Sequence, residues 1–269
     1  GQGKSALAAS VVRSLVGPSP IPDQSLENLK TEAGQTEENP FQVVLWLSLR
    51  HAPSLTEMLR TWVLFLAKRD ADIPSGVDEQ ISMLIECLRR WRCLLVLDDV
   101  EDILRKADTT GGAAQGYREY SNFFKRIATG DHQSSLLLIS DEQFQEIEQL
   151  MQSAGPRVRE MRLPPLARQA SRLLLRRQGI DAEDSVLDCA AQRYTDHPLA
   201  LLETAHVTQA LFSGDLAVYL AANIPITGAI YDLLEESFAR LSPLALEILS
   251  VLAEAGAPLA WSALNGALF

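Results

Sequence analysis

A short apolar run that ends in two carboxylates constrains the fold of this chain most: Leu94-Leu-Val-Leu-Asp-Asp99. Four consecutive apolar residues suit a strand that is buried on both faces, as in a parallel sheet. Such a strand brings its last side chains to the carboxyl edge of the sheet, where open α/β sheets bind ligands. The alternative is that Asp98 or Asp99 only caps a helix from Val100 to Lys106.

Similar runs recur along the first half of the chain, and helical patterns separate them. The other predicted strands are 41–49, 134–140 and a last short strand at 157–163. The predicted helices are 6–16, 55–68, 78–91, 117–129 and 144–153, with a capping box formed by Ser54 and Glu57. Polar stretches at 17–40 and 108–116 predict loops. Strands that alternate with helices indicate parallel βαβ units and an α/β fold.

The chain starts with a phosphate-binding pattern, Gly1-Gln-Gly-Lys-Ser5. It reads as the back half of the sequence G-x-x-x-x-G-K-[ST], in which glycines let backbone N–H groups approach phosphate oxygens. The lysine would reach the β- and γ-phosphates, and the serine hydroxyl would bind Mg²⁺. The helix that follows offers free N–H groups and a favourable dipole to an anion. The first glycine of the pattern and its preceding strand would lie before residue 1, so we expect the chain to be part of a longer protein.

Strand signals stop near Pro164-Pro165, where we predict a domain boundary. The predicted helices after it are 167–178, 184–194, 197–211, 215–222, 231–241, 245–255 and 259–268. Arg168, Arg172 and Arg176 fall on one helix face. They could contact phosphate, but a solvated stripe is the simpler interpretation.

The charge balance argues against nucleic acid as a partner. Through Arg162 the chain has 18 basic and 23 acidic residues, a net charge of −5, and the remainder has 6 and 12, a net charge of −6. A polyanion would be repelled at long range, which disfavours an ATP-driven machine acting on nucleic acid. No apolar run reaches the length of a membrane span. Three cysteines without metal-ligand spacing predict buried, reduced thiols in a cytoplasmic protein.

The order of these motifs resembles the NB-ARC type of STAND NTPase, the signalling ATPases that include plant disease-resistance and apoptosome proteins and many bacterial multidomain relatives. The resemblance rests on the chain start, on 47–53, on 94–101, on His197-Pro-Leu-Ala-Leu201 and on Ser237-Phe238 with Leu241-Ser-Pro243. It implies an α/β P-loop NTPase parallel sheet flanked by helices, then a helical-bundle domain and the start of a winged-helix domain. The implied domains are 1–163, 164–225 and 226–269.

The resemblance also implies site residues and ligands. ATP or ADP would be held by Gly1, Gly3, Lys4, Ser5, Ala6 and Pro198. Mg²⁺ would be bound by Ser5 and Asp98, and Asp99 would help Asp98 in catalysis by orienting or deprotonating the attacking water. Pro198 equally suits the first turn of a helix. His197 replaces the more usual neighbour there, and we expect a structural role for it.

One position departs from the family pattern. The family carries an arginine after the strand that corresponds to Leu136–Ser140, and here Asp141 and Glu142 follow. Two like charges ~4 Å apart cost about 4 kcal/mol at an effective dielectric near 20. Either Asp141 turns away, or ATP is held less well than ADP, or another arginine substitutes.

Two functions are compatible with the sequence. In the first, ADP holds the domains closed, exchange to ATP opens them and drives homo-oligomerisation, and slow ATP hydrolysis resets the switch. Protein partners would bind through domains outside this chain, and neither nucleic acid nor a membrane is expected as a partner. In the second, the chain is a catalytically degenerate NB-ARC-like scaffold for protein assembly with weak or no ATPase activity.

Overall fold

Two compact units make up the computed structural model, Gly3–Arg162 and the residues from Leu163 onward. The structure describes residues 3–16, 31–32, 40–51, 53–67, 72–103, 111–143, 145–224, 228, 231, 234–235, 238–239 and 241–268. The sequence places a first boundary after residue 163 and a second after residue 225, and both divisions stay predictions.

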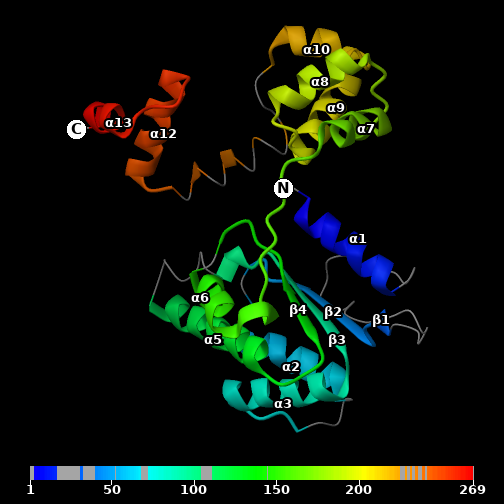
Figure 1. The fold of residues 1–269 in the computed structure, drawn as a ribbon, viewed down its shortest axis with the longest axis vertical. Helices are drawn as coiled ribbons and strands as arrows, with labels where there is room; N and C mark the ends of the chain where they lie inside the picture. Colours follow the sequence, from blue (N-terminus) through cyan, green and yellow to red (C-terminus); the bar gives the residue numbers. More distant parts are fainter. Residues whose placement is uncertain are drawn as a thin grey trace. The chain divides into compact units, whose positions relative to one another are not determined.

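A four-stranded sheet forms the centre of the first unit (Figure 1). Its strands, in sheet order, are β1 (Thr31–Glu32), β2 (Val43–Ser48), β3 (Cys93–Asp98) and β4 (Ser135–Leu138). β2, β3 and β4 are parallel, and the two-residue β1 is antiparallel to β2. Every residue of β3 is buried, as its continuous apolar run predicts.

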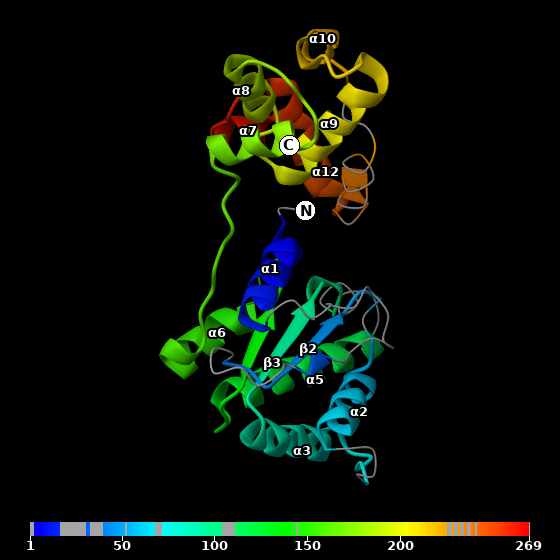
Figure 2. The same cartoon turned by 90° about the vertical axis from the view of Figure 1, so that its right-hand side faces the viewer.

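Helices cover both faces of this sheet (Figures 1 and 2). The helices of this unit are α1 (Lys4–Val16), α2 (Leu55–Leu66), α3 (Val77–Arg90), α5 (Gly111–Thr129) and α6 (Gln145–Ala154), with a 3₁₀ turn at Gly155–Arg157. Successive strand residues point to opposite faces. Leu45 and Leu95 therefore pack toward α2, α3 and α5, whereas Val44 and Val96 pack against α1.

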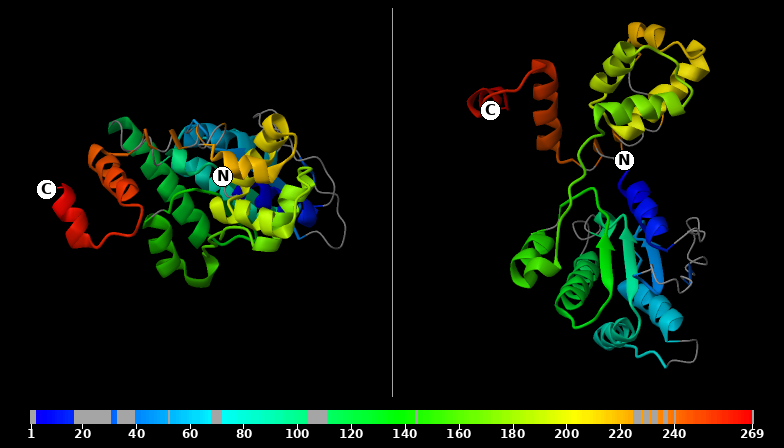
Figure 3. Two further views of the ribbon diagram at one scale, coloured as in Figure 1. Left: turned by 90° about the horizontal axis from the view of Figure 1, so that it is seen from above. Right: turned by 45° about the vertical axis from the view of Figure 1, so that its right-hand side comes forward.

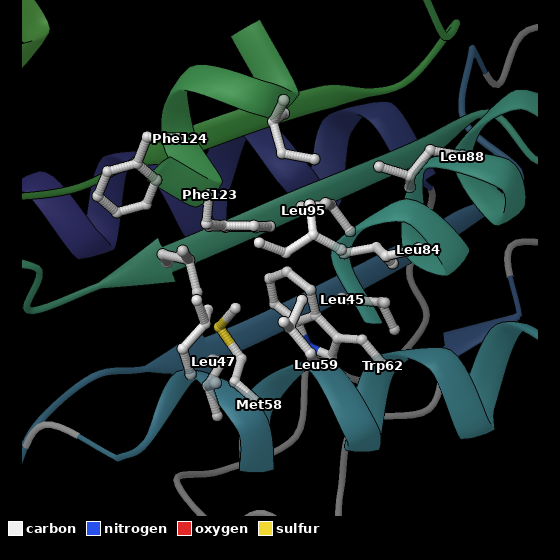
Figure 4. Close-up of a cluster of buried hydrophobic side chains, with 14 of the residues drawn as sticks. Leu45, Leu47, Met58, Leu59, Trp62, Leu84, Leu88, Leu95, Phe123 and Phe124 are labelled. Carbon is white, nitrogen blue, oxygen red and sulfur yellow. The ribbon is translucent and has the colours of Figure 1, made fainter. Parts of the chain in front are cut away.

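The larger core lies between the sheet and α2, α3 and α5 (Figure 4). Trp62 is fully buried among leucines of the strands and helices, and its ring lies 6.5 Å from that of Phe123 between centroids. The predicted capping box at the start of α2 is confirmed, because the Ser54 side chain accepts from the Glu57 N–H and Glu57 accepts from the Ser54 N–H.

Helices alone make up the described part of the second unit (Figure 3). They are α7 (Arg168–Arg177), α8 (Asp184–Arg193), α9 (Pro198–Phe212), α10 (Leu216–Ala222), α12 (Pro243–Ala255) and α13 (Trp261–Leu268). α7 to α10 enclose a small core centred on Leu175, Leu187, Leu201 and Leu216. α12 and α13 pack against each other.

The predicted fold class, an α/β P-loop NTPase sheet followed by a helical-bundle and a winged-helix domain, is wrong. The described residues are 63% helical, and their small sheet has three parallel strands. The described residues from 241 onward form two helices and no strand of a wing. The predicted strand at 157–163 is absent as well. Four of its seven residues are charged and Met161 is 76% exposed, so little of the segment is apolar, although Val158 packs against the core.

Two further expectations are corrected. The predicted loop at 108–116 is in part the first turns of α5, which begins at Gly111, while 104–110 lie outside the described residues. Cys87 and Cys93 are buried and free as predicted, but Cys189 is exposed on α8. Among the helices that the structure describes, none combines the length and the apolar character needed to cross a membrane.

Candidate functional site

The amino end of α1 follows a glycine with a positive φ. Gly3 has a φ of +83°, and a Cβ at this position would meet no atom of the other described residues within 4 Å. This left-handed conformation favours glycine and leaves the backbone open. The helix begins at Lys4, and the Leu7 N–H donates to the Gly3 carbonyl at 2.8 Å. The N–H groups of the first turn have no acceptor within the helix, so they are available to a phosphate.

Ser5 meets the carboxylate at the end of β3. Its hydroxyl donates to Asp98 Oδ1 at 2.9 Å, across 93 residues of sequence. Asp98 is only 8% exposed, and the Asp99 N–H also donates to Oδ1 at 3.1 Å. Burial raises the pKa of Asp98, and the hydrogen bond from Ser5 partly offsets this by lowering it. The structure thus brings together the two predicted Mg²⁺ ligands.

This donor set fits magnesium. Mg²⁺ prefers oxygen ligands and is usually bound by one or two carboxylates together with substrate phosphates and water. The described residues include no group of three or more His, Cys, Asp or Glu side chains that could hold a metal ion by themselves. Ser5 and Asp98 would therefore hold the ion in company with a phosphate ligand.

Lys4 forms an ion pair with Asp141, three residues after the end of β4. Asp141 therefore does not turn away from the lysine that is expected to bind phosphate. The Lys4 side chain is 24% exposed and that of Asp141 50%, so the pair lies at the rim of the site. Asp141, the residue that departs from the NB-ARC pattern, thus contacts Lys4 directly in the structure.

Asp99 is oriented by Ser48, the last residue of β2, and by Arg50, which follows that strand. The Ser48 hydroxyl donates to Asp99 Oδ2 at 2.6 Å, and Arg50 Nε lies 3.7 Å from the same oxygen. Asp99 itself has a φ of +56°, a conformation that aspartate tolerates better than most residues. Sequence reasoning gave Ser48 and Arg50 no role. Their position at the end of a predicted parallel strand was the signal, because the carboxyl ends of parallel strands lie at one edge.

Glu101 is a buried carboxylate at the same edge, also without a predicted role. Its Oε2 accepts from the Asp141 N–H at 3.2 Å. Burial raises the pKa of Glu101, and the charge of Asp141 raises it further. Glu101 therefore anchors the backbone of the residue that pairs with Lys4.

The remaining predicted ligands are less well defined. Gly1 lies outside the described residues, and Ala6 is exposed in the first turn of α1. Pro198 belongs to the other unit, at the first position of α9, so its contact with a nucleotide stays a prediction. His197 has the expected structural role, because its Nδ1 caps α9 by accepting from the Ala200 N–H at 3.4 Å.

The arginine stripe of α7 is paired with acidic side chains and is not merely solvated. Arg168 pairs with Asp196 at 3.2 Å, and Arg172 and Arg176 pair with acidic residues of α8 at 2.5 Å. The hydrogen bonds of Arg172 hold the pKa of Asp188 below its ordinary value. These arginines therefore join α7 to its neighbours.

Comparison with known proteins gives one informative match. No protein-family model matches the chain. Over 232 residues, or 84% of its length, the chain is 32% identical to an uncharacterized WD repeat-containing protein of Nostoc sp. strain PCC 7120. The chain spans 18% of the length of that relative. The relative is described as a WD repeat protein, not as a P-loop NTPase with helical-bundle and winged-helix domains, which further contradicts the predicted fold class.

Proposed function

We propose that this chain binds ADP and ATP with Mg²⁺ and is the nucleotide-dependent switch of a larger signalling protein related to the NB-ARC type of STAND proteins. Two contacts carry the proposal, and both join the amino end of α1 to the carboxyl edge of the sheet. Ser5 donates a hydrogen bond to Asp98, and Lys4 forms an ion pair with Asp141. A helix amino end, a lysine and an oxygen pair suited to Mg²⁺ are together the groups that a nucleotide polyphosphate requires.

Each residue has a distinct task in this proposal. The N–H groups after Gly3 and the Lys4 ammonium bind phosphate oxygens. Ser5 and Asp98 hold the ion, whose charge would neutralise phosphate oxygens when it is bound. Asp99, oriented by Ser48, positions water for a slow hydrolysis that resets the switch.

The switch acts on the remainder of the protein by nucleotide exchange. ADP favours a closed arrangement of residues 1–163 with 164–225 and 226–269, and ATP favours an open one that forms homo-oligomers. Driving the population from 1:99 to 99:1 requires about 5.5 kcal/mol of difference in nucleotide binding between the two states. The matched relative is described as carrying WD repeats, which supports recognition of protein partners outside this chain. Three free cysteines support a cytoplasmic location.

A calorimetric titration of the intact, nucleotide-free protein with ADP tests the proposal. We expect one ADP per chain in the presence of Mg²⁺. Chelating the metal should weaken binding at least tenfold, because the phosphates then lose the charge that Ser5 and Asp98 would hold beside them. Affinity that is the same with and without Mg²⁺ would contradict the assigned roles of these two residues.

The second candidate function is a scaffold for protein assembly without turnover. The Lys4–Asp141 pair favours it, because a carboxylate of the protein already satisfies the charge of the lysine. For a scaffold, the same titration gives no heat of binding while the protein remains folded. Steady ATP turnover that disappears in Asp98→Ala would exclude it.

A further inference from the structure

The ion pair between Lys4 and Asp141 places an anion of the protein on the side chain that the proposed function assigns to the phosphates. A phosphate that contacts Lys4 must displace this carboxylate or lie beside it. If the phosphate displaces Asp141, the ion pair with Lys4 is lost. If both stay, the carboxylate and the phosphate are two negative groups at contact distance. At the effective dielectric of a protein surface, that repulsion is several times larger than in bulk water.

The segment that carries Asp141 is held in place from both sides. The Ile139 N–H donates to the Leu97 carbonyl at 2.8 Å, and the Val100 N–H donates to the Ile139 carbonyl at 3.2 Å. The Asp141 N–H donates to the buried carboxylate of Glu101 at 3.2 Å. Moving the backbone of Asp141 away would leave that carboxylate without one of its hydrogen bonds, which is costly for a buried charge.

We infer that Asp141 is a specificity-determining residue that makes this site favour a nucleoside diphosphate over the triphosphate, an inference that rests on the proposed function. A triphosphate brings one more phosphate, with its negative charge, toward Lys4 than a diphosphate does. Asp141 therefore opposes the triphosphate more strongly. The chain would therefore rest with ADP bound.

Asp141→Asn tests the inference, because the amide keeps the shape of the side chain and removes its charge. The readout is the pair of dissociation constants for Mg·ADP and for Mg²⁺ with a non-hydrolysable ATP analogue, measured by calorimetry. We expect the ratio of the ATP-analogue constant to the ADP constant to fall at least tenfold. Glu142→Gln makes the same change of charge one residue further along, and it should leave the ratio within a factor of two or three.

The possible outcomes separate this inference from the proposed function. Wild-type protein that binds neither nucleotide overturns both. Wild-type protein that binds ADP, with an unchanged ratio in Asp141→Asn, overturns the inference alone. An equal fall of the ratio in Glu142→Gln also overturns it, because the effect then reflects net charge. If Asp141→Asn does not fold, Asp141→Ser is measured by the same criterion.

Discussion

Lys4→Ala lowers the affinity of the intact protein for Mg·ADP about a hundredfold. Hydrogen bonds to charged groups contribute about 1.5–3 kcal/mol each, and every 1.4 kcal/mol is a factor of ten in the dissociation constant. In the structure Lys4 contacts Asp141 at the rim of the site, so we expect its loss to leave the fold intact. The measurement is a calorimetric titration, with the circular dichroism spectrum of the variant as a check on folding.

Lys125→Ala is the matched control for this substitution. Lys125 is an exposed lysine on α5, in the same unit but outside the candidate site. The control removes the same charge and should bind ADP like the wild type. If Lys4→Ala also binds like the wild type, the phosphate-binding role of Lys4 is wrong.

Trp62→Ala costs about 3–5 kcal/mol in the free energy of unfolding, as expected for truncating a fully buried aromatic residue. Trp62 is packed between α2 and the sheet, with Phe123 on its other side, so its removal leaves a cavity that the strands cannot close (Figure 4). Urea unfolding monitored by circular dichroism measures the change as a lower midpoint.

Trp261→Ala is the control for this prediction, because Trp261 is 75% exposed. We expect it to change the free energy of unfolding by no more than about 0.5 kcal/mol. Trp62→Phe adds a second comparison. It keeps a ring in the core and removes the indole N–H, which has no hydrogen-bond partner among the described residues, so it should cost less than Trp62→Ala. Equal midpoints for Trp62→Ala and Trp261→Ala would contradict the assignment of the core.

The sequence predicts the helices and strands best where their residues are fully buried or are defined by local contacts. The run before Asp98 contains only apolar residues, and it forms a fully buried strand. Ser54 and Glu57 define the start of α2, because a capping box depends only on local contacts. Prediction failed where the outcome depends on distant neighbours. A strand at 157–163 would need a partner strand, and with four charged residues among its seven it offers little apolar surface to attract one.

In the candidate site, too, features that follow local patterns were predicted, and features that depend on distant neighbours were missed. Ser5 and Asp98 are 93 residues apart in sequence, yet each follows a recognisable local pattern, and the structure brings them within 2.9 Å. Ser48 ends a predicted strand, but its contact with Asp99 depends on the register of β2 against β3. The contact of Glu101 with the Asp141 N–H depends on the path of the chain after β4. The sequence identifies Asp141 as the unusual residue at its position. Its partner could be found only from the structure, because an ion pair with Lys4 requires the arrangement of α1 beside the end of β4.

The most direct test of a nucleotide switch is to identify the small molecule that copurifies with the intact protein. The protein is purified without added nucleotide and denatured, and the released material is separated by chromatography. We expect about one ADP per chain, since Asp141 opposes a triphosphate at Lys4. A folded protein that releases no nucleotide, and that also fails to take up added Mg·ADP, would contradict the proposed function and leave the scaffold as the better account.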